Sequence, residues 1–284
     1  MYSRKCQWMM IPSAGYQVSM KTHQVINLLT LSKIRLSSKK EYMLPSAFKP
    51  PPLPPEDINV YRCRNTGNYT STNYKNNLIS ALTAVAKNIR AHDGFYISSA
   101  GTIIEQVNAV ALCPIYLNSL LCEVCVNKSI PLLQTNCPNQ KEGVTWVANC
   151  MVRYSDRKIR GVLDDWVWVQ LPQYPVSSYV VELDQAVYDL ATRLHAKTQA
   201  AGANSLKKFA SGNITYGPQK YELFAVMQCT PDLSKEQTSS VINVYSVQCL
   251  RSSVVVRSGR LAARMLSPNC CFRYHPEEFA KNPF

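Results

Sequence analysis

The chain has 284 residues, enough for two domains of ordinary size, and its 46% hydrophobic content allows each a buried core. No run of about 18 apolar residues is present, so no transmembrane helix is expected. The net charge of +13 is concentrated at the start, where residues 1–49 hold eight Lys and Arg against one Glu. The remainder is nearly balanced, which argues against a nucleic-acid-binding domain.

Residues 1–55 are expected to form a basic N-terminal segment and a proline-rich linker without ordered structure. A secretory signal needs an uninterrupted apolar stretch of about 7–15 residues. The best candidate, residues 25–31, is broken by Asn27 and makes a poor signal. The run KPPPLPP at residues 49–55 predicts a stiff polyproline II spacer, with a P-x-x-P ligand motif as the weaker alternative.

A first domain is predicted over residues 56–171. Apolar residues recur at helical spacing in residues 74–90, after a start that Ser71, Thr72 or Asn73 can cap. A second helix is predicted over residues 117–133, with Pro131 fraying its end. The strand patterns of this domain are at residues 95–97, 103–112, 144–154 and 162–171.

A second domain is predicted over residues 176–284, after a four-residue link at residues 172–175. Its helix is expected at residues 181–197, and its strands include residues 207–209 and 221–227. Helices and strands are mixed without regular alternation, which is typical of α+β proteins. The sequence therefore predicts two tandem domains, each an antiparallel sheet packed against two helices. The short link predicts that they pack into one rigid body.

Six cysteines fall within 88 residues, at Cys63, Cys113, Cys122, Cys125, Cys137 and Cys150. Such a cluster indicates either a disulfide framework or a structural zinc site. Zinc sites usually need two close cysteine pairs or a pair of histidines, and here only one close pair exists. Three Asn-x-Ser/Thr sequons, at Asn68, Asn127 and Asn213, predict N-glycosylation and favour disulfides in the secretory pathway. Spacing alone does not choose among the pairings.

The C-x8-C-x2-C run from Cys113 to Cys125 resembles the core signature of the ginkbilobin-type cysteine-rich domain of plants. Supporting phrases stand in order: CRNTGNYT from Cys63, GFYISSAG from Gly94 and NCMVRYS ending at Ser155. A second copy is indicated by KFASG, FAVMQCTPDLS and SPNCCFRY, in that order, between residues 208 and 274. Such domains occur in tandem in cysteine-rich receptor-like kinases and in cysteine-rich repeat secretory proteins. Kinase signatures are absent, so the resemblance covers only the outer part of such a receptor.

The resemblance implies three bridges in the first copy: Cys63–Cys137, Cys113–Cys122 and Cys125–Cys150. In the second copy, Thr238 and Val241 stand where the signature has cysteines. The family pattern then leaves Cys249–Cys270 as the one bridge, with Cys229 and Cys271 unassigned. The second copy is expected to be less stable than the first, because each lost bridge costs roughly 3 kcal/mol.

Catalysis finds little support in the sequence. The four histidines are His23, His92, His195 and His275, and none lies in a motif with a nucleophile. His195 is expected to be solvated. Asp164 and Asp165 are interpreted as a turn or edge feature, because adjacent strand residues point to opposite faces. We expect a protein without enzymatic activity, cofactor or metal.

Ligand residues can be sought through the family's mannose-binding antifungal lectin, which uses an Asn, an Arg and a Glu around the first and last cysteines. The first copy has Arg64, Val144 and Ser155 at these positions, and none matches. The second copy keeps the arginine as Arg264 and has His275 in place of the glutamate. Arg264 is therefore the one candidate ligand residue, with an ordinary surface arginine as the alternative. Partly exposed aromatic anchors are an additional candidate, at Trp146, Trp166 and Trp168.

The function predicted is that of a non-enzymatic extracellular recognition module of plant stress or defence signalling. The resemblance implies a secreted apoplastic protein or the ectodomain fragment of a receptor-like kinase, although no convincing signal peptide is present. We favour a misplaced start over a protein that stays reduced in the cytosol. The expected partner is a cell-surface or apoplastic protein, or a carbohydrate. The alternatives are a mannose-binding antifungal lectin and a thiol-based redox sensor that uses Cys229 or Cys271.

Overall fold

A computed structural model describes residues 59–147, 150–164, 169–175, 178–200, 208–242 and 260–278. These residues all belong to one compact unit. The expected N-terminal segment with its signal candidate and proline spacer lies outside the described residues, as do Cys6, His23, Cys249, Trp166 and Trp168. No described helix has the length and apolar character needed to cross a membrane.

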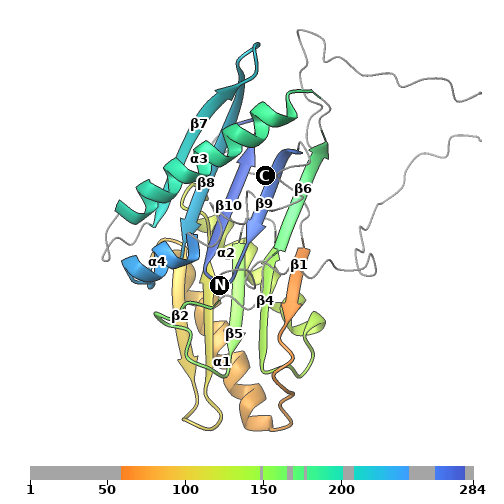
Figure 1. Ribbon diagram of the computed structural model, residues 1–284. Coiled ribbons are helices and arrows are strands. Elements are labelled where there is room, and N and C mark those ends of the chain that lie inside the picture. Colours follow the sequence, from red (N-terminus) through yellow and green to blue (C-terminus); the bar gives the residue numbers. More distant parts are fainter. Residues whose placement is uncertain are drawn as a thin grey trace, which may run out of the picture. The chain divides into compact units, whose positions relative to one another are not determined.

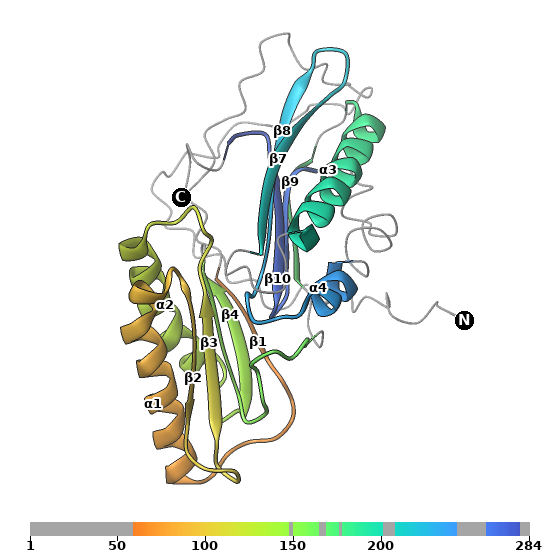
Figure 2. The ribbon, with the colours of Figure 1, turned by 90° about the vertical axis from the view of Figure 1, so that its left-hand side faces the viewer.

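The first domain is built on a five-stranded antiparallel sheet in the order β1-β4-β5-β3-β2 (Figure 1). Its strands are β1 (Asn59–Cys63), β2 (Phe95–Ala100), β3 (Val107–Leu112), β4 (Glu142–Val147) and β5 (Cys150–Ser155). The helices are α1 (Thr72–Asn88), followed by the 3₁₀ turn η1 (Ile89–His92), and α2 (Ser119–Asn136). Both α-helices cover the same face of the sheet, where an apolar core joins them to β3 and β5 (Figure 2).

Helix α1 forms where the apolar spacing predicts it. The Ser71 hydroxyl caps its start by accepting hydrogen bonds from the backbone N–H groups of Asn73 and Tyr74, at 3.1 and 3.4 Å. Leu78, Leu82 and Val85 are fully buried on one face of the helix, as expected from their spacing.

Two expectations for the first domain are wrong in detail. Pro131 does not end α2, which continues to Asn136. A proline lacks the N–H that bonds to the carbonyl four residues earlier, but burial of Leu133 beyond it holds the helix against the sheet. The strand expected at residues 103–112 begins only at Val107. Ile103 and Ile104 lie in the preceding turn and are 96% and 94% exposed.

The second domain repeats this architecture with the strand order β6-β9-β10-β8-β7. Its strands are β6 (Val169–Pro175), β7 (Phe209–Tyr216), β8 (Tyr221–Cys229), β9 (Arg260–Leu266) and β10 (Cys270–His275). Its helices are α3 (Val180–Ala200) and α4 (Lys235–Ile242). Leu183, Val187, Leu190 and Leu194 of α3 are buried against this sheet, as the helical spacing predicts.

The expected domain boundary is wrong. The segment 172–175, interpreted as a link, lies inside β6, and β6 pairs with β9 of the second sheet. Residues 169–171, assigned to the first domain, therefore belong to the second. The edge position of β6 explains why two prolines are tolerated in a strand. The connection between the domains is upstream, after β5.

A third apolar cluster joins the two sheets through the faces that carry no helices. Leu112, Trp146 and Met151 of the first sheet pack in one cluster with Val169 and Leu266 of the second. The connecting segment adds Ile159, which is 3% exposed. The tandem domains therefore share buried apolar surface, and their packing into one rigid body stays a prediction.

Candidate functional site

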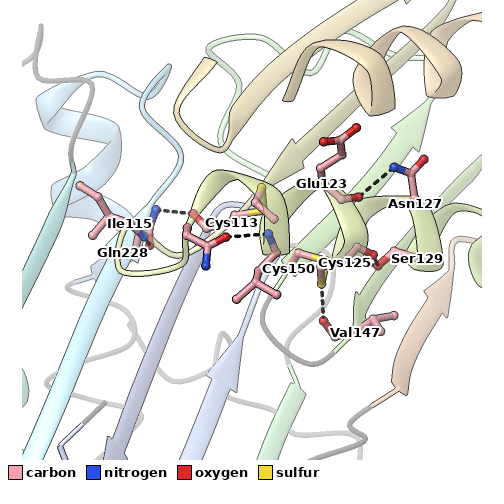
Figure 3. The surroundings of a disulfide bond; sticks show 12 residues. Cys113, Ile115, Glu123, Cys125, Asn127, Ser129, Val147, Cys150 and Gln228 are labelled. Carbon is pink, nitrogen blue, oxygen red and sulfur yellow. Dashed lines mark hydrogen bonds between the residues drawn. A yellow bond between two sulfur atoms is a disulfide. The ribbon is translucent and has the colours of Figure 1, made fainter. Parts of the chain in front are cut away.

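Helix α2 is bound to three strands of the first sheet by disulfides. Cys63 at the end of β1 pairs with Cys137 at the end of α2, and Cys113 beyond β3 pairs with Cys122. Cys125 pairs with Cys150 at the start of β5 (Figure 3). These are the three pairs that the family resemblance implies.

The disulfide of the second domain differs from the one expected from the family pattern. Cys270 pairs with Cys229, not with Cys249. The reason is the register, since Cys229 and Cys270 lie directly opposite each other on neighbouring strands β8 and β10. Cys271 is the remaining free cysteine among the described residues.

The two copies show why the pairing changes. Cys113 and Cys150 are the next pair in the β3–β5 register, the same place that Cys229 and Cys270 hold. In the first copy each of them bonds to a cysteine of α2. In the second copy Thr238 stands where α2 has Cys122, one turn after the helix start. Because the described helix α4, Lys235–Ile242, contains no cysteine, the two strand cysteines bond to each other.

A side-chain clamp joins the domains beside these disulfides. The Gln228 side-chain amide of β8 donates to the carbonyl of Cys113 at 3.0 Å. The same amide group accepts from the N–H of Ile115 at 3.3 Å (Figure 3). Gln228 is 8% exposed, so these bonds satisfy polar groups inside the interface.

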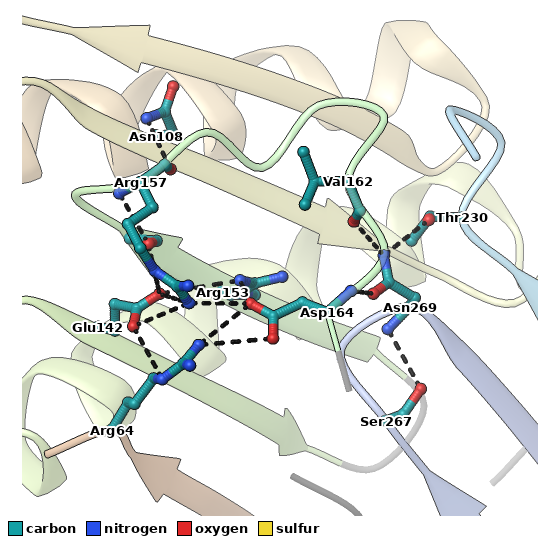
Figure 4. A network of polar contacts seen from close by, with 11 residues as sticks. Arg64, Asn108, Glu142, Arg153, Arg157, Val162, Asp164, Thr230, Ser267 and Asn269 are labelled. Atoms are coloured by element: carbon teal, nitrogen blue, oxygen red, sulfur yellow. Dashed lines mark hydrogen bonds and ion pairs between the residues drawn. The ribbon is translucent and has the colours of Figure 1, made fainter. Parts of the chain in front are cut away.

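A charged network occupies the other end of the first sheet's helix-free face (Figure 4). Glu142 of β4 contacts three guanidinium groups, those of Arg157 at 2.9 Å, Arg64 at 3.4 Å and Arg153 at 3.9 Å. Asp164 of the connecting segment contacts the same three arginines. The Ser155 hydroxyl donates a further hydrogen bond to Glu142.

Burial dominates the electrostatics of this network. The Glu142 side chain is 1% exposed and that of Arg153 is 3% exposed. Burial raises the pKa of Glu142, against the opposing effects of the Ser155 hydrogen bond and the arginines. Burial also lowers the pKa of Arg153, although both carboxylates oppose this shift. Three arginines and two carboxylates leave this network with one excess positive charge.

The segment after β5 connects this network to the second domain. The N–H of Asp164 donates to the Asn269 side chain at 2.8 Å, and the N–H of Gly161 donates to Asp232 at 2.7 Å. Gln237 of α4 donates to the carbonyl of Gly161 at 2.9 Å. The segment is therefore fixed on both domains by polar contacts. Sequence reasoning missed this role for Asp164, which it interpreted as a turn or edge residue.

The residues mapped from the lectin are not arranged as a surface sugar site. Arg264 is 5% exposed, so its interpretation as an ordinary surface arginine is wrong. Val144, Ser155 and His275 are also buried. Arg64 is half-buried and belongs to the charged network.

Other sequence candidates have mixed outcomes. Trp146 is 5% exposed and packs in the cluster between the sheets, so it is not a surface anchor. His195 is buried on α3, contrary to the expected solvated position. Asn68, Asn127 and Asn213 are exposed, and glycosylation at them stays a prediction. The described residues contain no group of His, Cys, Asp or Glu able to hold a metal ion.

His275 predicts a pH dependence of stability. Its Nδ1 accepts a hydrogen bond from the N–H of Glu277 at 2.9 Å, and burial lowers its pKa to about 4. The unfolded chain, with an ordinary histidine pKa of about 6.5, binds the proton first, so stability falls as the pH drops from about 6.5 to about 4. We expect His275 to lower the free energy of unfolding by about 2 kcal/mol at about pH 5 relative to neutral pH.

Urea unfolding of the wild type and the His275→Gln variant at both pH values measures this effect. Burial lowers the pKa of His195 too, so the variant should lose part of the pH dependence and not all of it. The His92→Gln variant is the control, because His92 is exposed. An unchanged pH dependence in His275→Gln would contradict the prediction.

The structure thus defines the class of the protein as a tandem α+β module. Disulfides join helix to sheet in its first copy, and a disulfide joins two strands in its second copy. The chain matches the model of the salt stress response/antifungal (Stress-antifung) family over residues 62–157. It therefore contains a Stress-antifung domain, and the ginkbilobin-type resemblance is confirmed.

Among the relatives, cysteine-rich receptor-like protein kinase 14 of Arabidopsis thaliana is 28% identical over 79% of this chain and 34% of its own length. Cysteine-rich repeat secretory protein 38 of the same plant is 29% identical over 76% of this chain and 82% of its own. The tandem DUF26 ectodomain of the Arabidopsis receptor-like protein PDLP8 has a similar fold, with a TM-score of 0.62 and 16% identity. It covers 78% of this chain and 98% of its own. The chain spans about a third of the length of cysteine-rich receptor-like protein kinase 14 and of putative cysteine-rich receptor-like protein kinase 20.

Proposed function

We propose that the chain acts as a non-enzymatic extracellular recognition module of plant stress or defence signalling. The observation that carries this proposal is the tandem fold with a disulfide-stapled first copy, which is similar to the fold of a receptor-like protein's ectodomain. Disulfides persist in oxidising compartments, which supports an extracellular location. In this proposal the module binds an extracellular protein, as a secreted protein or as part of a receptor.

The most prominent apolar feature of the described surface is the turn between β2 and β3. Ile103 and Ile104 are almost fully exposed there, and Val181 of α3 is 77% exposed in the other domain. Burial of two adjacent exposed isoleucines against a partner is favourable. The turn is therefore the best candidate for a contact with another protein.

The burial of the mapped lectin positions weighs against the mannose-binding alternative, because Arg264 and His275 are 5% and 3% exposed and present little surface to a sugar. The redox-sensor alternative is also weakened. Cys229 is in a disulfide. Burial raises the pKa of the Cys271 thiol to about 11, which disfavours the reactive thiolate.

The test is a binding screen of the purified full-length protein against a panel of plant extracellular domains, with a glycan array in parallel. We expect saturable binding to at least one protein domain and none to mannose-type glycans. An Ile103→Ser/Ile104→Ser variant should lose the protein interaction, whereas Val181→Ser should keep it. Binding to mannose glycans without any protein partner would favour the lectin instead.

A further inference from the structure

Lys208 is a buried lysine at the entry to the second sheet. It directly precedes β7, and its carbonyl accepts a hydrogen bond from the N–H of Cys229 at 2.8 Å. The residue is 2% exposed, and its Nζ makes no hydrogen bond with any described residue. Burial of an ammonium group is costly because the group loses its hydration. The surroundings of Nζ therefore have to compensate for that loss.

Asp232, in the loop before α4, supplies an opposite charge. Its Oδ2 accepts a hydrogen bond from the N–H of Gly161 in the connecting segment at 2.7 Å. Its Oδ1 is buried and has no hydrogen-bond partner among the described residues. Burial lowers the pKa of Lys208, and the negative charges of Asp232 and Glu236 oppose that shift. A buried donor and a buried acceptor of opposite charge therefore interact without a direct hydrogen bond between them.

The first copy has a glycine at the corresponding place. The carbonyl of Gly94 accepts from the N–H of Cys113 at 2.7 Å, as the carbonyl of Lys208 does from Cys229. A Cβ added at Gly94 would lie 3.1 Å from the Cβ of Cys113 and 3.7 Å from the Sγ of Cys122. A side chain at this position therefore starts beside the disulfide that joins the sheet to α2.

In the second copy a lysine side chain starts at this place, and the disulfide to the helix is absent from the described residues. Helix α4 has Thr238 at the position of the α2 cysteine, and Cys229 bonds to Cys270 on the neighbouring strand. The attraction between Lys208 and Asp232 then links the start of the sheet to the loop that leads into α4. A charge interaction thus occurs where the first copy has a covalent bond.

We propose that one buried water molecule bridges Lys208 Nζ and Asp232 Oδ1 and so joins the second sheet to the start of α4. The ammonium group donates to the water oxygen, and the water donates to the carboxylate, so both groups gain a hydrogen bond. Buried waters typically bind to such otherwise unpartnered polar groups. Asp232 extends the link through Oδ2 to Gly161. The inference goes beyond the proposed recognition function and does not depend on it.

A high-resolution crystal structure of the wild-type protein tests the proposal directly. We expect one ordered water within hydrogen-bond distance of both Lys208 Nζ and Asp232 Oδ1. Any arrangement without this bridging water overturns the proposal, including a direct contact between the two side chains or another protein group bound to Nζ.

Hydrogen exchange of the full chain measures the effect of the link in solution. Lys208→Met keeps an unbranched side chain of similar length but leaves the Asp232 carboxylate without its bridge. We expect the amides of α4 and of Gly161 to exchange about 10-fold faster, while those of α2 stay unchanged. Lys197→Met, at an exposed lysine of α3, is the control and should exchange like the wild type.

If Lys208→Met fails to fold, Asp232→Asn replaces it. Asparagine keeps an oxygen for the N–H of Gly161 but removes the negative charge that faces the lysine. The same acceleration at α4 is expected. Unchanged exchange at α4 in the variant that folds would contradict the proposed link.

Discussion

Replacing Cys63 and Cys137 together with alanine is expected to lower the free energy of unfolding of the first domain by about 4.4 kcal/mol. The bridge spans a sequence separation of 74 residues, the longest among the described disulfides. A cross-link that closes a long loop removes more entropy from the unfolded chain than one that closes a short loop. It also fixes the edge strand β1 to the end of α2.

The matched control is the pair Cys113 and Cys122, whose separation is only nine residues. Its replacement by alanine is expected to cost about 2.6 kcal/mol by the same entropy relation. Chemical denaturation followed by the near-ultraviolet signal measures both variants. A larger loss for the short loop than for the long one would contradict the loop-entropy account.

Substituting Glu142 with glutamine is expected to destabilise the protein by about 3–5 kcal/mol. Glutamine keeps the shape of the side chain but removes the negative charge that faces Arg64, Arg153 and Arg157. The Arg153 side chain is 3% exposed, so water cannot replace the lost carboxylate, and Asp164 alone is left to balance the three arginines. Urea denaturation of the variant and the wild type at neutral pH measures the loss.

Glu123→Gln is the control for this experiment. The Arg90–Glu123 pair has a similar separation of 3.5 Å, but its side chains are 59% and 34% exposed. Exposed pairs contribute at most about 1 kcal/mol, so this variant should be nearly neutral. Comparable losses for Glu123→Gln and Glu142→Gln would show that burial does not govern the strength of the network.

The local features of the fold follow from the sequence because their causes are local. The spacing of Leu78, Leu82 and Val85 marks one face of α1, and Ser71 supplies a cap that the sequence alone suggests. The disulfide pairing of the first copy was predicted from the family resemblance, because cysteine spacing does not determine pairing.

The features that the sequence did not predict depend on contacts between distant residues. The pairing of β6 with β9 places residues 169–175 in the second domain, before the expected domain boundary. Nothing in these residues indicates which sheet they join. The register that places Cys229 opposite Cys270 decides the second-copy bridge. In the sequence, Gln228 and Asn269 do not differ from ordinary polar residues, because their hydrogen-bond partners come from distant parts of the chain. Arg264 and Arg273 become neighbours only through the β9–β10 register.

The central claim is that disulfides join α2 to its sheet in the first copy, whereas a disulfide joins two strands in the second copy. Peptide mapping of the native protein under non-reducing conditions tests this claim most directly. The account predicts linked peptides for Cys63–Cys137, Cys113–Cys122, Cys125–Cys150 and Cys229–Cys270. Recovery of Cys113 and Cys122 as thiols, or of Cys270 linked to Cys249, would contradict it.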